Sequence, residues 1–368
     1  MVASAPDNSY SIGMKKKLRV AVLFGGKSAE HEVSLISARN IIASLDPRTY
    51  EVILVGMTKT GQLLPPKQSE ILLGASASKI SRALTVTQKE TGAPLGDIGA
   101  KQKDIGVVFP VLHGPFGEDG TVQGFLRLLD VPFVGAGVLG SAVGMDKDVM
   151  KRLLRDAGIP SAQFLIATRE SPVSWRSATK KLGLPLFVKP ANLGSSVGIS
   201  KVRTKKEFER ATRHAFRFDT KIILEECIHG REIECAVLGN ENPKASILGE
   251  VVVHHDFYSY EAKYIDPEGA TLDIPAKLSR ATTQCIQNLA IKTFKTLGCE
   301  GMGRVDFFVT KKGAIYVNEI NTIPGFTNIS MYPKLWEASG VPYAKLVDTL
   351  IQLALQRHKK QQRLVASL

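Results

Sequence analysis

A lysine at the end of a predicted strand, followed by a loop of small residues, is the first feature of this sequence that could do chemistry. Lys189 ends the apolar run 186–188, and the Gly- and Ser-containing segment 190–198 follows it. Backbone N–H groups of such a loop can surround phosphate oxygens, whereas a lysine inside a strand is costly unless its ammonium meets an anion. An ordinary hairpin turn would not explain Lys189. The pattern therefore favours a phosphate-binding loop.

Two carboxylates in neighbouring apolar strands form a second chemical feature. Asp306 and Glu319 lie in runs joined through the turn 312–313, and strands paired about that centre place the two residues opposite each other, with Asn321 on the same face. Opposed carboxylates are unfavourable without a cation, and two carboxylates with an amide oxygen suit Mg²⁺ or Mn²⁺. The alternative is a surface pair bridged to a basic neighbour such as Arg304, which the apolar surroundings disfavour. The hairpin predicts a divalent-cation site.

Two other glycine-rich segments resemble nucleotide-binding loops, but each lacks part of the required pattern. The Gly-Gly-Lys-Ser segment 25–28 lacks the first glycine of a P-loop, because that position is Ala21. Residues 135–140 satisfy G-x-G-x-x-G after a predicted strand, but only a weak helix start follows at 141–148. The region near 160 also lacks the acidic residue that should end a second strand. NAD binding is therefore disfavoured.

The elements that must position these residues fall into three groups. Apolar runs and helical spacing over 18–57 predict a β-α-β unit and hence a parallel sheet, to which short strands at 107–110 and 131–134 are added. A helix from about Asp146, closely spaced strands, a polar aromatic loop at about 254–272 and a final helix over about 343–357 follow. The later strands are predicted at 186–189, 222–225, 232–238, 247–253, 305–309 and 315–320. The outline is a small parallel α/β domain followed by two α+β lobes rich in antiparallel hairpins.

Composition narrows the possible classes of protein. The 368 residues predict about two or three domains, and 44% hydrophobic with 23% charged residues excludes wholesale disorder. No stretch reaches the roughly 18 apolar residues of a membrane span. The four cysteines show no zinc spacing, which favours free thiols in a reducing compartment, and we expect a cytoplasmic protein. The net charge of +13 is diffuse, so nucleic-acid binding is the alternative and not the first choice.

Seven short motifs follow one another along the chain. They are residues 25–34 (Gly-Gly-Lys-Ser-Ala-Glu-His-Glu-Val-Ser), 113–120 (His-Gly-Pro-Phe-Gly-Glu-Asp-Gly), 145–147 (Met-Asp-Lys), 189–198, 260–264 (Tyr-Glu-Ala-Lys-Tyr), 303–306 (Gly-Arg-Val-Asp) and 318–325 (Asn-Glu-Ile-Asn-Thr-Ile-Pro-Gly). This set resembles the D-alanine–D-alanine ligases of the ATP-grasp superfamily over about residues 18–355. Each motif alone is weak, but the ordered set is highly specific.

The resemblance implies a three-lobed ATP-grasp architecture in which two α+β lobes grip ATP. The domains it implies are a disordered leader (1–14), an N-terminal α/β substrate domain (15–135), a central lobe (136–232) and a C-terminal lobe with the metal site and a lid loop (233–368). It also implies a homodimer and the ATP-dependent ligation of two D-alanine molecules through an acyl phosphate. The product, D-alanyl-D-alanine, is a peptidoglycan precursor. No nucleic-acid or membrane partner is implied.

Site residues carry over by motif position. The resemblance assigns ATP to Lys147, Lys189, Ser196, Glu225, Glu226, Ile228 and Glu232, and the metal ion, Mg²⁺ or Mn²⁺, to Asp306, Glu319 and Asn321. It assigns catalysis to Glu30, Ser195, Tyr264, Arg304 and the backbone N–H of Gly325, and D-alanine binding to His113, Lys263 and Ser330. Glu30, Ser195 and Tyr264 should form a hydrogen-bonded triad, and Tyr264 is the family's mark of the dipeptide type.

Several of these residues also have simpler explanations. Glu30 could cap the helix that follows it, His113 could bond backbone groups of a glycine-rich turn, and Tyr264 could anchor a loop. The family match favours the functional role for all three. Another ATP-grasp ligase with a different carboxylate and amine is the alternative enzyme, because spacing alone says nothing about the chirality of the substrate.

Overall fold

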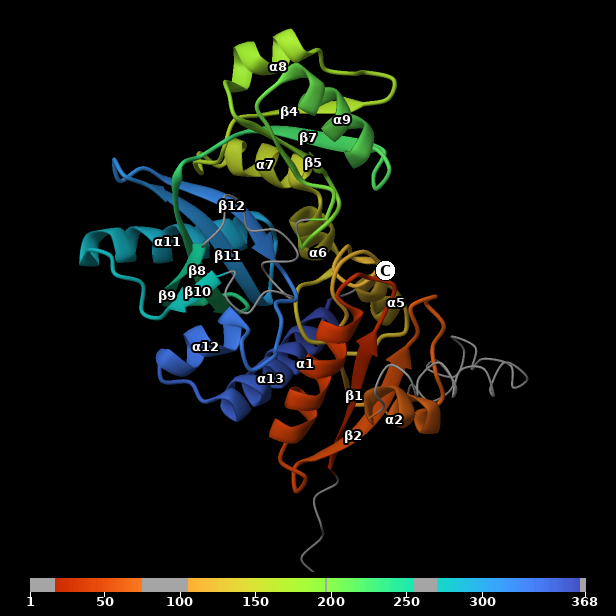
Figure 1. Ribbon diagram of the computed structural model, residues 1–368. Helices are drawn as coiled ribbons and strands as arrows, with labels where there is room; N and C mark the ends of the chain where they lie inside the picture. Colours follow the sequence, from red (N-terminus) through yellow and green to blue (C-terminus); the bar gives the residue numbers. More distant parts are fainter. Residues whose placement is uncertain (1–16, 75–104, 196, 254–269, 365–368) are drawn as a thin grey trace, which may run out of the picture.

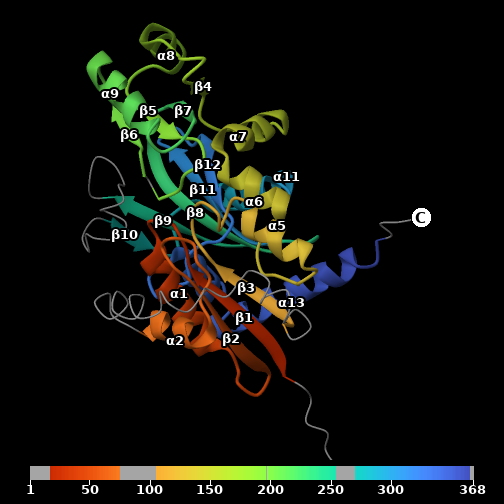
Figure 2. The same cartoon turned by 90° about the vertical axis from the view of Figure 1, so that its right-hand side faces the viewer.

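Three β-sheets organise the chain, whose computed structural model describes residues 17–74, 105–195, 197–253 and 270–364 (Figures 1 and 2). The predicted leader (1–14) lies outside these ranges, as does the predicted loop at about 74–101 apart from Gly74. The polar loop expected at about 254–272 is likewise outside them up to residue 269, and its last positions belong to a strand.

The N-terminal sheet is parallel, with the strand order β2-β1-β3. The strands β1 (Leu18–Gly25) and β2 (Tyr50–Met57) flank α1 (His31–Ser44), which confirms the predicted β-α-β unit. The remaining elements of this region are α2 (Pro66–Gly74), β3 (Val107–Val111) and α5 (Thr121–Leu128). Strand β1 is almost wholly buried, which explains its continuous apolar run.

Two sequence predictions for the segment after α5 are wrong. Residues 131–134 form no strand but a single parallel bridge between Phe133 and Val108. The carbonyls of Phe133 and Gly135 instead accept hydrogen bonds from the buried Arg357, at 2.7 and 2.5 Å, and Gly135 (φ 94°) turns the chain away. The next helix, α6 (Val138–Met145), begins inside the glycine motif and not after it. A second helix, α7 (Lys147–Asp156), follows directly, so no dinucleotide-type strand is formed.

The central sheet is antiparallel in the order β4-β7-β5-β6. Its elements are β4 (Phe164–Thr168), α8 (Trp175–Leu182), β5 (Leu186–Pro190), β6 (Ser200–Val202), α9 (Lys205–Ala215) and β7 (Lys221–Glu226). Helix α9 begins with a capping box between Thr204 and Glu207, which satisfies backbone N–H groups at its start. The helices α8 and α9 pack with the sheet around a core of their own, at the top of Figure 1.

The C-terminal sheet is antiparallel in the order β10-β9-β8-β11-β12. Its elements are β8 (Gly230–Gly239), β9 (Lys244–Val253), β10 (Ala270–Asp273), α11 (Arg280–Thr296), β11 (Gly301–Thr310), β12 (Ile315–Asn321), α12 (Met331–Ala338) and α13 (Tyr343–Gln361). Helix α7 joins this lobe, because Met150 and Leu154 pack with the apolar face of α11 and the sheet. All four cysteines are free thiols, of which Cys235 and Cys299 are buried, Cys227 is half-buried and Cys285 is exposed. The predicted division into one parallel and two antiparallel sheets is confirmed.

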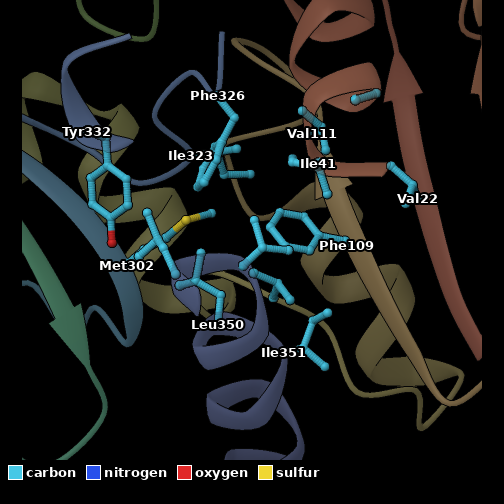
Figure 3. Close-up of a cluster of buried hydrophobic side chains, with 14 of the residues drawn as sticks. Val22, Ile41, Phe109, Val111, Met302, Ile323, Phe326, Tyr332, Leu350 and Ile351 are labelled. Atoms are coloured by element: carbon cyan, nitrogen blue, oxygen red, sulfur yellow. The ribbon is translucent and has the colours of Figure 1, made fainter. Parts of the chain in front are cut away.

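One continuous apolar core unites the N-terminal sheet with the C-terminal lobe (Figure 3). Phe109 of β3 meets Phe326 edge to face, with ring centroids 6.0 Å apart, and Phe326 also contacts Tyr332 of α12. Leu350 and Ile351 of α13 complete the cluster between the two sheets. Burial of each such side chain contributes about 1.5–3 kcal/mol, so these two regions are packed as one body.

Candidate active site

A cleft of about 990 Å³ lies between the central and C-terminal sheets. Strand β5, the loop after it, the connector from β7 to β8 and the hairpin β11–β12 line its walls. The site residues predicted from the sequence that line this cleft are Lys147, Lys189, Ser195, Glu225, Glu226, Ile228, Glu232 and Glu319. Residues from three separate motifs and from the connector between β7 and β8 are therefore brought together. Ser196 lies outside the described residues, as do Lys263 and Tyr264.

A buried carboxylate holds two lysines beneath the cleft. Oε2 of Glu225 accepts a hydrogen bond from Nζ of Lys189 at 2.5 Å, and Oε1 lies 3.0 Å from Nζ of Lys151. Burial alone would raise the pKa of Glu225, but the two ammonium groups outweigh it and lower that pKa to about 2. Burial likewise acts to lower the pKa of Lys189, yet the charge of Glu225 leaves it raised. Both residues are therefore charged at neutral pH.

Sequence reasoning missed Lys151. It lies four residues after Lys147, on the face of α7 that carries Met150 and Leu154, and it is completely buried. A lysine at helical spacing within an apolar face was the available indication, because such a side chain needs a buried partner.

Lys147 links the predicted phosphate loop to the acidic hairpin. Its Nζ donates to the carbonyl of Leu193 at 2.8 Å and lies 3.4 Å from Oε2 of Glu319. The helix that begins at Lys147 is capped by Asp146, whose side chain accepts from two backbone N–H groups and also from Nζ of Lys221. The cap therefore fixes the place where Lys147 enters the cleft.

The predicted pairing of Asp306 with Glu319 is confirmed, although by a different route. Near the turn, Phe307 pairs with Val317, and that register alone would place Asp306 opposite Asn318. A β-bulge takes Asn318 out of the ladder, so Asp306 pairs with Glu319. The bulge supplies the one-residue shift that the sequence analysis had attributed to the turn.

Basic side chains hold both carboxylates in this conformation. Arg304 donates to the two oxygens of Asp306, each at 2.8 Å, and its Nε lies 2.8 Å from Glu234. Glu319 faces Lys147, and Oδ1 of Asn321 accepts from the N–H of Ile323 at 3.2 Å. Among the described residues, no three His, Cys, Asp or Glu side chains converge as a metal site. The donor set of two opposed carboxylates and an amide oxygen nevertheless fits a hard divalent cation.

A second group of predicted residues lies where the N-terminal sheet meets the C-terminal lobe. His113 Nδ1 bonds the carbonyl of Ile323 at 3.0 Å, while its buried Nε2 has no hydrogen-bond partner among the described residues. Glu30 occupies the N-cap position of α1, yet its side chain makes no capping hydrogen bond. The simpler role of Glu30 as a side-chain cap is therefore absent.

Glu118 joins the two loops at this boundary. It belongs to the motif 113–120, and no role was predicted for it. Its Oε2 accepts from the N–H of Gly114 at 2.7 Å and its Oε1 from the N–H of Ile323 at 3.2 Å. Burial and the charge of Glu30 raise the pKa of Glu118 to about 8, against the lowering effect of these two hydrogen bonds. Glu30, His113 and Glu118 thus lie close enough together to interact electrostatically.

The last predicted pair lies just beyond the hairpin. Oγ of Ser330 accepts from the N–H of Thr327 at 3.0 Å, and a Cβ added to Gly325 would stand 2.7 Å from that oxygen. A side chain at position 325 would therefore force the Ser330 hydroxyl to move. The segment from Asn321 to Gly325 leads from the acidic hairpin to the His113 region, so the two groups of residues share one loop.

Comparison with known proteins agrees with this arrangement. A family model described as D-ala D-ala ligase N-terminus matches residues 19–136, and one described as D-ala D-ala ligase C-terminus matches residues 153–352. A D-alanine–D-alanine ligase of Shouchella clausii is 50% identical over 95% of this chain and 98% of its own length. D-alanine–D-alanine ligase A of Escherichia coli K12 is also 50% identical, over 93% and 97%.

Solved structures support the same relationship. The D-alanine–D-alanine ligase from Coxiella burnetii has a TM-score of 0.80 and 40% identity, and the match covers 95% of this chain and 97% of the other. The Bacillus anthracis ligase, solved in complex with ATP, has a TM-score of 0.73 and 29% identity over 94% and 99%. In the part of the chain that the structure describes, no helix is both long and apolar enough to cross a bilayer.

Proposed function

This chain belongs to the D-alanine–D-alanine ligase family, and on that premise we propose how its residues join two D-alanine molecules at the expense of ATP. The activity yields D-alanyl-D-alanine, ADP and phosphate, and the dipeptide is a precursor of peptidoglycan. The cleft carries the proposal, because Lys147, Lys189 and Glu319 line it together and Glu319 pairs with Asp306 in the hairpin. Cations beside a divalent-metal donor set are what phosphoryl transfer needs.

ATP binds along the cleft. Lys147 and Lys189 contact the α- and β-phosphates, and the loop that contains Ser195 and Ser196 covers them with backbone N–H groups. The connector at Glu225, Glu226 and Ile228 presents backbone donors and acceptors to adenine, and Glu232 accepts the ribose hydroxyls. The support for this orientation is that β7 ends at Glu226, so the connector backbone beyond it lines the cleft outside the ladder.

Asp306, Glu319 and Asn321 would hold a divalent cation, Mg²⁺ or Mn²⁺. When bound, such a cation neutralises charge on the phosphoryl oxygens. Each carboxylate now pairs with a basic side chain, Asp306 with Arg304 and Glu319 with Lys147. These basic partners orient the opposed carboxylates before the nucleotide arrives.

The first D-alanine lies at the boundary between the N-terminal sheet and the C-terminal lobe. Glu30 holds its ammonium group and His113 lies beside it, which would give the buried Nε2 a partner. The carboxylate of this D-alanine attacks the γ-phosphorus of ATP, which forms an acyl phosphate and releases ADP. Arg304 and the N–H of Gly325 stabilise the oxygen that becomes negative in the next step.

The second D-alanine binds through its carboxylate to Lys263 and Ser330. After its ammonium loses a proton, the amine attacks the acyl carbonyl, the C–N bond forms and phosphate leaves with the electrons of the C–O bond. Ser195, Glu30 and Tyr264 form the triad that orients this step. The proposal includes a homodimer in the cytoplasm, for which the family resemblance is the support.

The decisive test is phosphate release from ATP across a panel of D- and L-amino acids, with Mg²⁺, with Mn²⁺ and with excess chelator. We expect D-alanine alone of the small amino acids to give rapid release, with D-alanyl-D-alanine as product, and chelator to abolish it. Release driven by another amine or carboxylate would favour a different ATP-grasp ligase. Activity that survives chelation would remove the metal from the proposal.

A further inference from the structure

One fully buried lysine has no part in the scheme above. The side chain of Lys151 is 1% exposed, and its Nζ lies 3.0 Å from Oε1 of Glu225. This contact is an ion pair between two buried groups. Burial lowers the pKa of Lys151 in spite of the attraction of Glu225. Because burying a lysine is expensive, this residue requires an explanation.

Three charged side chains follow one another from beneath the cleft to its wall, in the order positive, negative, positive. Lys151 stands below Glu225, and Glu225 in turn holds Lys189, whose side chain is 11% exposed and lines the cleft. Without Lys151, the Glu225 carboxylate would still have Lys189 as its partner. The free protein thus needs only one of the two lysines to keep that carboxylate paired.

Nucleotide binding changes this balance. The three N–H donors of Lys189 would be shared between Glu225 and a phosphate oxygen, so phosphate binding draws this ammonium away from Glu225. If Lys189 left while Lys151 was missing, a carboxylate that is only 3% exposed would remain without a cation. Removing one partner of a buried ion pair is strongly unfavourable for that reason. With Lys151 present, the carboxylate stays paired throughout.

We propose that Lys151 is a positioning residue for the nucleotide: it holds Glu225 from beneath the cleft and so leaves Lys189 free to move to the phosphates. The inference rests on the proposed function for the role of Lys189 and adds a residue that touches neither substrate. The stability of the free protein does not depend on it.

The test compares nucleotide affinity with stability in Lys151→Met, which keeps the length of the side chain and removes its charge. In the absence of D-alanine, we expect the dissociation constant for Mg-ATP, measured by calorimetry, to rise about tenfold. The melting temperature of the free protein should stay unchanged or rise, since a costly buried charge is gone. Arg155→Met removes a charge from the exposed side of the same helix and serves as the matched control, with wild-type affinity expected.

A double variant separates positioning from a merely structural role. In Lys151→Met/Glu225→Gln no carboxylate can be left unpaired, so the affinity should return to within about threefold of Glu225→Gln alone, as coupled residues do in a double-mutant cycle. Wild-type affinity in Lys151→Met would overturn the proposal. Failure of that variant to fold, or weak binding that the double variant does not repair, would assign Lys151 to the fold instead.

The proposed function fails separately. Suppose that Lys151→Met bound Mg-ATP about tenfold more weakly than the wild type, but that the wild type released no phosphate with D-alanine. The ligase assignment would then be wrong, and the role of Lys151 would stand.

Discussion

The C-terminal lobe meets its two neighbours through surfaces of opposite chemistry. Against the N-terminal sheet it buries aromatic and aliphatic side chains in one continuous core, seen in Figure 3. Toward the central sheet, Lys147 and Glu319 of this lobe line a cleft whose other wall carries the ion pair of Lys189 with Glu225. An apolar core cannot open without exposing its side chains to water, whereas charged groups can exchange one partner for another.

The apolar interface should hold its residues in place, whereas the charged interface can change its ion pairs. In the proposal, the first D-alanine binds beside the apolar joint, where Phe109 and Phe326 pack, so the residues around it should keep fixed positions. The proposed nucleotide cleft contains ion pairs such as Lys189 with Glu225, in which a phosphate could take the place of the carboxylate. We therefore expect motion during turnover to be concentrated between the central sheet and the rest of the molecule. The predictions below test each side of this comparison.

The largest effect is expected at the apolar joint. Phe326→Ala removes a ring that is 1% exposed and contacts both Phe109 and Tyr332. The free energy of unfolding, from chemical denaturation, should fall by about 3–5 kcal/mol because a cavity is left between the sheets. Phe218→Ala, at a ring that is 42% exposed in the central lobe, is the control and should cost much less. Equal losses in the two variants would contradict a joint between the two regions.

In the cleft, a substitution should lower turnover and leave stability almost unchanged. Glu319→Gln keeps the shape of the side chain but removes a charge that faces Lys147 and, in the proposal, the cation. Turnover at saturating Mg²⁺ should fall about 10²–10³-fold, as when another charge-stabilising group is removed from an active site. The melting temperature should change little, because this side chain is 30% exposed. Near-normal turnover would remove Glu319 from the metal shell.

The most gradual effect is expected where the two regions meet, at Glu118. Its pKa of about 8 in the folded protein exceeds the ordinary value of 4.5, so the folded protein holds a proton that the unfolded chain releases between these values. Stability should therefore fall as pH rises through this window and level off above about 8, by at most about 1.4 kcal/mol per pH unit.

Glu118→Gln cannot titrate and should lack this slope. Denaturant midpoints at pH 6, 7, 8 and 9 for both proteins provide the measurement, and the slopes are compared rather than the absolute stabilities. Parallel profiles would mean that Glu118 is ionised in the folded protein at neutral pH. The burial of its carboxyl group would then have no effect on the pH dependence of folding.

Local patterns predicted much of this molecule. The β-α-β unit followed from the apolar run of β1 and the helical spacing of α1, since both periodicities depend only on near neighbours. A loop after Lys189 was also predicted, and its binding of phosphate stays a prediction. The opposition of Asp306 and Glu319 was also predicted, although the bulge at Asn318 that produces it was not. A bulge depends on how a neighbouring strand pairs, which a single strand's sequence does not show.

The sequence by itself determined the order of the motifs, the type of each sheet and the residue types that the chemistry needs. Only the tertiary structure decided which charges meet. Lys151 and Glu225 stand 74 positions apart, and Glu118 and Ile323 stand 205 apart. No helical or strand periodicity reaches over such distances, so these contacts arise from the packing of whole elements. The segment 131–134 likewise pairs with β3 only around Val108, and Arg357 of the last helix, more than 220 positions further on, bonds the carbonyls of Phe133 and Gly135.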